Sequence, residues 1–305
     1  MTAHAAILAP DSLTVVAPAR RRPPVGLLVL PGLALLVLGL FLPLGQVLWM
    51  SLNPPEPGVI APVAELTLAN YARLMRSDFY LGIVGRTLWL SALTTLLTAV
   101  FGMVLGLSVW RARPSVRGML LVMILAPLLV SIVARTYGWV VLLGDKGALN
   151  SVLMALGLTD EPLRIMYTQP AVLIGLVHVF LPFMVLSLLG ALDRIDPLLT
   201  EAAATLGASR WHVFRHVILP LAVPGLASGT IIVFSLSMSS YVTPALMGGS
   251  RSGLMTTFIY QQFSVTMNWH FGATMVAVLL AATLALLLAV VGWSRWYTRQ
   301  WSLAR

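Results

Sequence analysis

Few residues of this chain have the type and spacing that enzyme chemistry requires. His212 and His216 lie four residues apart, a spacing that can bind a metal ion on a helix, but no Glu follows His212 and no third ligand is apparent. Lys146 is the only lysine, and Gly144-Asp145-Lys146-Gly147 lacks the spacing of a phosphate-binding P-loop. Cysteine is absent, and the chain has no GxSxG motif. We therefore expect no catalytic residue, no metal site and no bound cofactor, and an integral membrane enzyme is disfavoured.

The composition indicates a protein that is largely surrounded by lipid. Of the 305 residues, 59% are hydrophobic and only 10% are charged, with a mean hydropathy of +0.92. A soluble domain carries about 25% charged residues. The net charge is +9, but the positive residues lie in short segments between apolar stretches, which is typical of membrane orientation. Nucleic acid is therefore not an expected partner, whereas membrane lipid is.

Six stretches are apolar enough to cross a membrane, which requires about 20 residues. The predicted spans are Val25–Met50, Ile83–Trp110, Gly118–Leu142, Pro170–Leu192, Leu221–Leu246 and Gly272–Trp293. The first follows three arginines, but it is too long for a cleaved signal peptide and no Ala-x-Ala site follows, so we expect an anchor. The fold class is thus an all-α, multi-pass membrane protein.

The distribution of positive charges predicts the orientation. With the N-terminus inside, 12 of the 19 Lys and Arg residues lie inside and 5 lie clearly outside. The remaining two, Arg86 and Arg135, lie near outer span ends, where we expect them to reach the lipid head groups. Both termini are predicted to be cytoplasmic. The domains are then a tail over residues 1–24, a six-span domain over 25–296 and a tail over 297–305.

A polar, helix-forming segment lies between the fourth and fifth spans, on the predicted cytoplasmic side, and we call residues 193–220 the knuckle. Asp196-Pro197 is a helix start, because the carboxylate can cap the first backbone N–H groups and proline fits the first helical position. Residues 198–206 continue with strong helix formers. The first half of the knuckle is therefore predicted to be a helix.

The second half of the knuckle contains a turn and another helix. Gly207 fits the helix stop, where a left-handed residue is needed, and Ser209 can cap a helix over residues 210–219. Pro220 marks the entry to the fifth span. This second helix places Trp211, Phe214 and Ile218 on one stripe. The stripe can pack against the protein's own helix ends or dock into a partner, and both can hold on different faces.

The knuckle resembles a known family. The pattern Glu-Ala-Ala, three residues, Gly, nine residues, Ile-x-Leu-Pro marks permease subunits of bacterial binding-protein-dependent ABC importers. Here it reads Glu201-Ala202-Ala203, Gly207 and Val217-Ile218-Leu219-Pro220, with Val217 in place of Ile. The resemblance implies a type I ABC importer permease fold in the bacterial inner membrane. In that family this loop docks on the ATPase subunit and transmits its movement.

The resemblance also implies partners and a coupling site. The partners are a second permease subunit, expected to differ from this one, an ATPase dimer that binds ATP and Mg²⁺, and a periplasmic solute-binding protein. Glu201 is expected to fix the knuckle's geometry by charge and hydrogen bonding. The coupling residues are Asp196, Glu201, Ala202, Ala203, Gly207, Ala208, Ser209, Trp211, Phe214, Arg215, Leu219 and Pro220.

Two further stretches resemble the spermidine/putrescine branch of the family. They are Arg135-Thr136-Tyr137-Gly138-Trp139, with Leu143-Gly144 following, and Tyr241–Gly249. A polyamine is therefore the expected solute. Another organic amine, a phosphonate or an opine-like compound is the alternative, because permeases for such solutes look much alike.

The absence of acidic residues from the spans bears on the mechanism. No Asp or Glu falls inside a predicted span, whereas proton- or sodium-coupled carriers usually bury such groups, so a stand-alone carrier or channel is disfavoured. Aromatic faces could attract a cation instead, and interfacial anchoring is their alternative role. His178, alone in the fourth span, is expected to be a hydrogen-bonded packing residue. The candidate pathway residues are Tyr137, Trp139, Ser237, Ser240, Tyr241 and Thr243.

Overall fold

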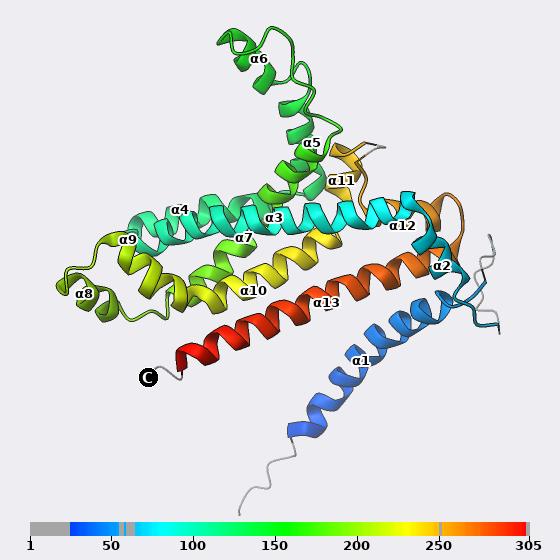
Figure 1. Cartoon of the computed structure of the whole chain (residues 1–305), viewed down its shortest axis with the longest axis horizontal. Coiled ribbons are helices and arrows are strands. Elements are labelled where there is room, and N and C mark those ends of the chain that lie inside the picture. The colour runs from blue at the N-terminus through cyan, green and yellow to red at the C-terminus, as the bar shows by residue number, and fades with distance from the viewer. Residues whose placement is uncertain (1–24, 55–57, 59–64, 250–251, 303–305) are drawn as a thin grey trace, which may run out of the picture. The chain divides into compact units, whose positions relative to one another are not determined.

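The computed structural model describes residues 25–54, 58, 65–249 and 252–302, and these residues form helices joined by turns and irregular segments, with no strand among them (Figure 1). The chain divides into two units, residues 1–46 and 47–305. The predicted tail over residues 1–24 lies outside the described residues. The last helix continues to Ser302, past the predicted end of the six-span domain at residue 296, and residues 303–305 lie outside the described part.

The helices follow one another along the chain with short connections. Their bounds are α1 Val25–Met50, α2 Ala69–Arg76, α3 Asp78–Arg111, α4 Pro114–Leu129, α5 Ile132–Leu143, α6 Ala148–Ala155, α7 Gln169–Leu192, α8 Pro197–Thr205, α9 Arg210–Val213, a π turn Phe214–Ile218, α10 Leu219–Met238, α11 Val242–Met247, α12 Met255–Ser264 and α13 Trp269–Ser302.

Five helical stretches in the described part are long and apolar enough to cross a membrane. They are Val29–Met50, Asp78–Arg111, Gln169–Leu192, Arg210–Met238 and Trp269–Tyr297. A sixth span exists only if α4 and the segment that follows it are counted together, because the two are bent by 98° at their junction. The first and fourth predicted spans agree with α1 and α7 to within a residue.

The third predicted span, Gly118–Leu142, is not one continuous helix. It breaks at Val130 and Ser131, between α4 and α5. Pro127 has no N–H to donate to the previous turn and its ring crowds the carbonyl there, so the helix ends two residues later. Arg135, expected to reach the head groups, instead donates a 2.9 Å hydrogen bond to the Val130 carbonyl at the break. The arginine thus satisfies a backbone group that the break leaves open.

The fifth predicted span ends earlier than expected, at Met238 rather than Leu246. Pro244 cannot donate an N–H to the carbonyl of Ser240, so a continuous helix would leave that carbonyl unsatisfied. The Oγ1 atom of Thr256 donates to this carbonyl instead, at 2.5 Å. The chain therefore turns at Ser239–Tyr241 and resumes as the short helix α11.

The centre of the second unit is a bundle of α3, α7 and α10, each in contact with the other two (Figure 1). Two Gly-x-x-x-Gly pairs, Gly102 with Gly106 on α3 and Gly225 with Gly229 on α10, face α7. A Cβ placed on Gly225 would lie 2.6 Å from the Ala191 Cβ, well inside van der Waals contact. Small residues allow such close approach of membrane helices. The helix α7 is therefore packed between two glycine pairs.

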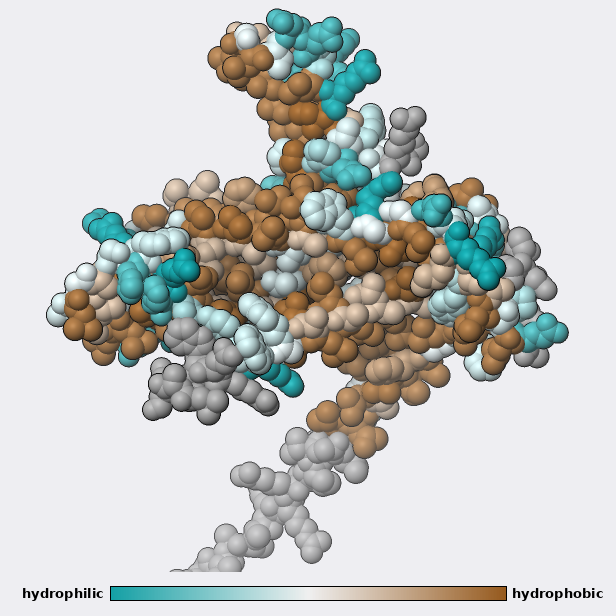
Figure 2. All heavy atoms as spheres, viewed as in Figure 1, coloured by the Kyte–Doolittle hydropathy of each residue, from teal (hydrophilic) through white to brown (hydrophobic). Residues whose placement is uncertain are grey.

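Side chains of one kind gather on different parts of the surface of this unit. Hydrophobic residues cover the visible face over α3 and α4, and hydrophilic residues gather over α8–α9 and over α6 (Figure 2). Helix α4 has no buried residue in the described chain, and Leu129 on it is 90% exposed. This distribution suits long helices whose apolar sides contact lipid or another membrane subunit.

The segment around α6 is held together by one buried side chain. The amide of Asn150 donates to the carbonyls of Gly144 and Leu163, each at 3.1 Å, and its oxygen accepts from the Leu163 N–H at 2.9 Å. Asn150 is fully buried. Residues 144–163 therefore form an ordered lobe that projects from the side of the helix bundle, above α5 in Figure 1.

Candidate functional site

The knuckle has the local structure predicted from its sequence. The Asp196 carboxylate accepts a 2.9 Å hydrogen bond from the Leu198 N–H at the start of α8, and Pro197 occupies the first helical position. Gly207 follows α8 with φ = 81°, the left-handed conformation that glycine adopts without a Cβ clash. Ser209 caps α9 by accepting from the His212 N–H at 3.3 Å. Helix, glycine turn and helix are thus confirmed.

One face of the knuckle is packed against the ends of the spans. Val213 and Ile218 are buried in a cluster with Leu192, Ile195 and Ala222. The cluster brings the end of α7, the start of α10 and partly buried residues of α3 and α8 together. Movement of the knuckle would therefore disturb the packing of all three central helices.

The other face of the knuckle presents large apolar side chains to the surroundings. Trp211 is 66% exposed and Leu206 is 88% exposed. The ring of Trp211 lies 5.4 Å from that of Phe214, which is half-buried, while Ile218 is fully buried. The predicted stripe is thus divided between internal packing, which is confirmed for Ile218, and an open surface at Trp211, where docking of a partner stays a prediction.

Glu201 does not hold the knuckle's geometry within this chain. Its side chain is exposed and its carboxylate makes no hydrogen bond or ion pair with any described residue, whereas its backbone carbonyl accepts from the Thr205 hydroxyl at 3.0 Å. The expected hydrogen bonding of the Glu201 side chain within the knuckle is therefore not found among the described residues, where α8 is held by its cap and is followed by the glycine turn. Arg215 is also exposed and lacks a partner among the described residues.

A π turn joins the knuckle to the fifth span. The Leu219 N–H donates to the Phe214 carbonyl, five residues earlier, and the helix then continues as α10. Pro220 follows directly, and its ring would crowd the His216 carbonyl in a regular α-helix, so the wider turn relieves that contact. The second predicted helix therefore does not stop before the span; α9, the π turn and α10 form one continuous rod.

Two more features at this end of the molecule were not predicted. Arg117 at the start of α4 makes a 2.7 Å ion pair with Asp193 at the end of α7. Exposed pairs of this kind contribute about 0–1 kcal/mol. The rings of His212 and His216 stack with their centroids 4.0 Å apart on the exposed side. No group of three or more His, Cys, Asp or Glu that could hold a metal occurs among the described residues.

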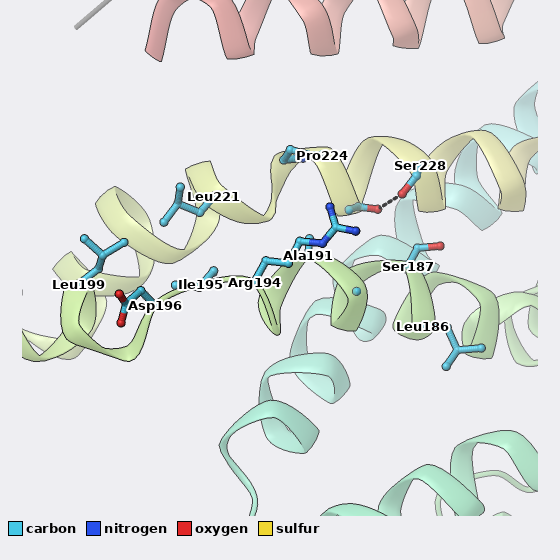
Figure 3. A pocket seen from close by; sticks show the side chains of 12 residues that line it. Leu186, Ser187, Ala191, Arg194, Ile195, Asp196, Leu199, Leu221, Pro224 and Ser228 are labelled. Carbon is cyan, nitrogen blue, oxygen red and sulfur yellow. Dashed lines mark hydrogen bonds between the residues drawn. The ribbon is translucent and has the colours of Figure 1, made fainter. Parts of the chain in front are cut away.

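A groove of about 530 Å³ lies between α7 and α10 next to the knuckle. Figure 3 shows its lining from both helices, with Arg194 extended from the end of α7 toward α10 and the Ser228 hydroxyl bonded to the Gly225 carbonyl at 3.0 Å. Its volume falls within the range of about 300–1,000 Å³ for small-molecule sites. The groove is partly polar, with Ser187, Arg194, Asp196 and Ser228 among apolar residues.

The predicted pathway residues lie away from the knuckle, on α5, α10 and α11 and in the turn that joins α10 to α11. Tyr137 is 54% exposed, and Tyr241 packs its ring 4.8 Å from that of Tyr260 on α12. Tyr260 was not among the residues selected from the sequence, because nothing in the sequence indicated that α12 folds beside Tyr241. The Trp139 indole N–H donates to Nδ1 of His178 at 3.1 Å, which confirms His178 as a hydrogen-bonded packing residue.

Three of the predicted pathway residues are buried. Ser237 and Thr243 are fully buried, and neither hydroxyl finds a hydrogen-bond partner among the described residues. Ser240 is 8% exposed and offers its carbonyl to Thr256. In this conformation these three residues contribute to helix contacts, and they would meet a solute only after a rearrangement.

Comparison with known proteins identifies the class of this membrane protein. The family described as binding-protein-dependent transport system inner membrane component matches residues 98–302, which include α7, the knuckle and α10. The chain belongs to this family. The permease is thus an inner-membrane protein of the ABC importer class, and members of this family are not the catalytic subunits.

Curated relatives match the permease over most of their length. The spermidine/putrescine transport system permease protein PotB of Haemophilus influenzae is 35% identical over 225 residues, covering 74% of this chain and 78% of the relative. PotB of Escherichia coli K12 is 34% identical over 255 residues, covering 84% of this chain and 92% of the relative. Both alignments extend beyond the knuckle region.

Solved structures match the fold of the permease. A chain of a bacterial ABC transporter that imports the acidic polysaccharide alginate superposes with a TM-score of 0.72 over 89% of this chain and 94% of that chain, at 19% identity. A chain of the MetNI methionine transporter matches with a TM-score of 0.55 over 72% of this chain and 99% of that chain, at 19% identity. The type I importer permease fold is therefore confirmed.

Proposed function

We propose that this chain is a permease subunit of an ATP-driven importer of polyamines such as spermidine and putrescine. The observation that carries the proposal is the 34–35% identity to spermidine/putrescine permeases along 74–84% of the chain. The two stretches that resemble that branch, around Tyr137 and Tyr241, lie within the same fold. The solute alternatives remain another organic amine, a phosphonate or an opine-like compound.

The importer contains further subunits in this proposal. A second, different permease subunit completes the pathway, two ATPase subunits bind ATP and Mg²⁺, and a periplasmic binding protein delivers the solute. The coordinates of alginate transporters, one of them in complex with its solute-bound periplasmic protein, support this arrangement by analogy of fold. This chain itself binds no nucleotide and hydrolyses none.

The knuckle is the proposed contact with the ATPase, on the cytoplasmic side. Support comes from its two faces: Trp211 and Leu206 are open to a partner, while Val213 and Ile218 are packed among the central helices. Closure of the ATPase dimer would move the knuckle, and the continuous rod of α9 and α10 would transmit that movement to the spans. Glu201 and Arg215, whose side chains have no partner among the described residues, then contact the ATPase rather than the knuckle.

The proposed pathway uses aromatic rather than acidic side chains to attract a cationic solute. Tyr137 and Tyr241 present exposed ring faces, and each aromatic face can contribute about 0.5–2 kcal/mol to cation binding. Trp139, Ser237, Ser240 and Thr243 would take part when the spans rearrange.

The test is ATPase activity of the purified assembly in nanodiscs. The candidate binding protein is added without solute, with spermidine or putrescine, and with a panel of other solutes. Stimulation by the polyamine-loaded protein alone is the expected result. Stimulation only by another solute would refute the polyamine assignment, and failure of this chain to co-purify with any ATPase would refute the importer.

A further inference from the structure

A basic pocket lies between the last turn of α3 and the knuckle. Two adjoining hollows, each of about 340 Å³, share Arg111, Thr200 and Val213 in their linings. Arg210 lines one of them and Trp110 lines the other. Arg111 is the last residue of α3 and Arg210 is the first of α9, so the pocket joins a span to the knuckle.

The two arginines bring uncompensated charge to this pocket. Both side chains are exposed. Neither has a carboxylate within 4.0 Å among the described residues, whose ion pair is Arg117–Asp193. Guanidinium groups remain charged at any physiological pH, and their planar N–H donors match the oxygens of a phosphate group. The pocket therefore suits an anion, specifically a phosphate.

Apart from Thr200, the rest of the pocket lining is apolar, and the pocket lies at the end of a candidate membrane span. Trp110 is half-buried, Val213 is 8% exposed and Ile218 is 1% exposed. Arg111 is the last residue of the 34-residue candidate span Asp78–Arg111, so the pocket lies at one end of that span. Tryptophan beside arginine is typical of this level, and basic pockets at span ends bind anionic head groups.

We propose that this pocket binds the phosphate of an anionic phospholipid, which connects the end of α3 to the knuckle. The head-group phosphate lies between Arg111 and Arg210, and the glycerol region lies against Trp110. A free phosphate would leave the apolar wall uncovered, and an acidic side chain of a protein partner would not fill it. The lipid thereby stabilises the position of the knuckle relative to the span.

The experiment measures retention of phosphatidylglycerol by the purified complete assembly, using native mass spectrometry after reconstitution in phosphatidylcholine with and without phosphatidylglycerol. Arg111→Gln and Arg210→Gln are compared with Arg113→Gln, which removes the same charge two residues from Arg111 but outside the pocket. We expect each pocket variant to weaken phosphatidylglycerol binding about tenfold, the loss of one charged hydrogen-bonding group, and the control to leave it unchanged.

Three results would overturn the proposal. Equal retention by all variants would mean that the arginines do not hold a lipid. Loss of the ATPase subunit from the pocket variants with lipid retention intact would assign the arginines to protein docking. Retention of inorganic phosphate that is lost in both pocket variants, while their phosphatidylglycerol retention equals that of the parent, would identify the ligand as a soluble anion.

Discussion

The contact between α7 and α10 predicts that one added methyl group will destabilise the permease. In Gly225→Ala the new Cβ would lie 2.6 Å from the Ala191 Cβ, 2.8 Å from the Ser187 carbonyl oxygen and 3.3 Å from the Leu188 Cα. Carbon atoms pack at about 3.5–4.0 Å, so the two helices would have to separate by about 1 Å. None of these atoms is the mobile end of a side chain. Overpacking of this kind costs about 1–3 kcal/mol.

Gly106→Ala on α3 is the matched control, because it makes the same chemical change in the other glycine pair. Its Cβ would lie 3.7 Å from the Leu188 Cβ and 3.7 Å from the Leu192 Cδ1, which is ordinary contact. Replacing a helical glycine by alanine stabilises the helix by about 0.8–1.0 kcal/mol, and this gain applies to both variants. The difference between their unfolding free energies therefore isolates the packing cost of about 1–3 kcal/mol.

The assay is reversible unfolding in mixed micelles, followed by tryptophan fluorescence for both variants and the parent protein. We expect Gly106→Ala to equal or exceed the parent in stability and Gly225→Ala to fall below both. If Gly225→Ala is as stable as Gly106→Ala, then α7 and α10 do not approach as closely as described, and the argument from the glycine pairs is wrong.

Three other perturbations have defined outcomes. The Gly207→Val variant should insert normally yet abolish uptake, because a β-branched residue resists φ = 81°. The Gly207→Asn variant should retain uptake, since asparagine tolerates this conformation. Equal uptake by the two variants would contradict the proposed role of the turn. Asp196→Ala should lower the unfolding free energy by about 0.5–2 kcal/mol through loss of the α8 cap, and Asp196→Asn should restore most of it. Thr87→Val should cost about 1–3 kcal/mol, because it leaves the buried Met255 N–H without its acceptor, while Thr98→Val, which breaks only a bond to its own helix, should cost less in the same titration.

The knuckle could be predicted from sequence because its signals are local. A cap at Asp196, a proline beside it, a glycine at the left-handed position and a second cap at Ser209 each act within a few residues. The structure places all four as expected. The matching family pattern extends over the same residues, so the sequence indicated both the shape of this segment and its class.

The breaks in the third and fifth spans could not be predicted in the same way. Prolines occur inside several helices of this chain, including Pro31, Pro43 and Pro182, without ending them. At the two breaks, by contrast, side chains from other segments, Arg135 and Thr256, donate hydrogen bonds to the open carbonyls of Val130 and Ser240. Whether a proline ends a membrane helix therefore depends on partners that hydropathy does not reveal.

The packing of the central bundle and the basic pocket were also beyond the sequence. Both Gly-x-x-x-Gly pairs are visible in the chain, but nothing in it says that both of them pack against α7. Arg111 and Arg210 are 99 positions apart, and their approach follows from the burial of Val213 and Ile218 against the ends of the spans. Glu201 shows the reverse case: its motif is clear in the sequence, but its carboxylate has no partner among the described residues.

The π turn between the knuckle and α10 gives this rod one residue more than a regular helix of the same length needs. Such a surplus residue can shift along a helix by exchanging one hydrogen bond for its neighbour, without unwinding the rest. Each such step rotates the residues it passes by about 100° around the helix axis and moves them by about 1.5 Å along it. The junction can therefore convert a small axial displacement of the knuckle into rotation of the side chains at its boundary, so that Phe214, Val217 and Ile218 change the helices they face while the rod stays intact.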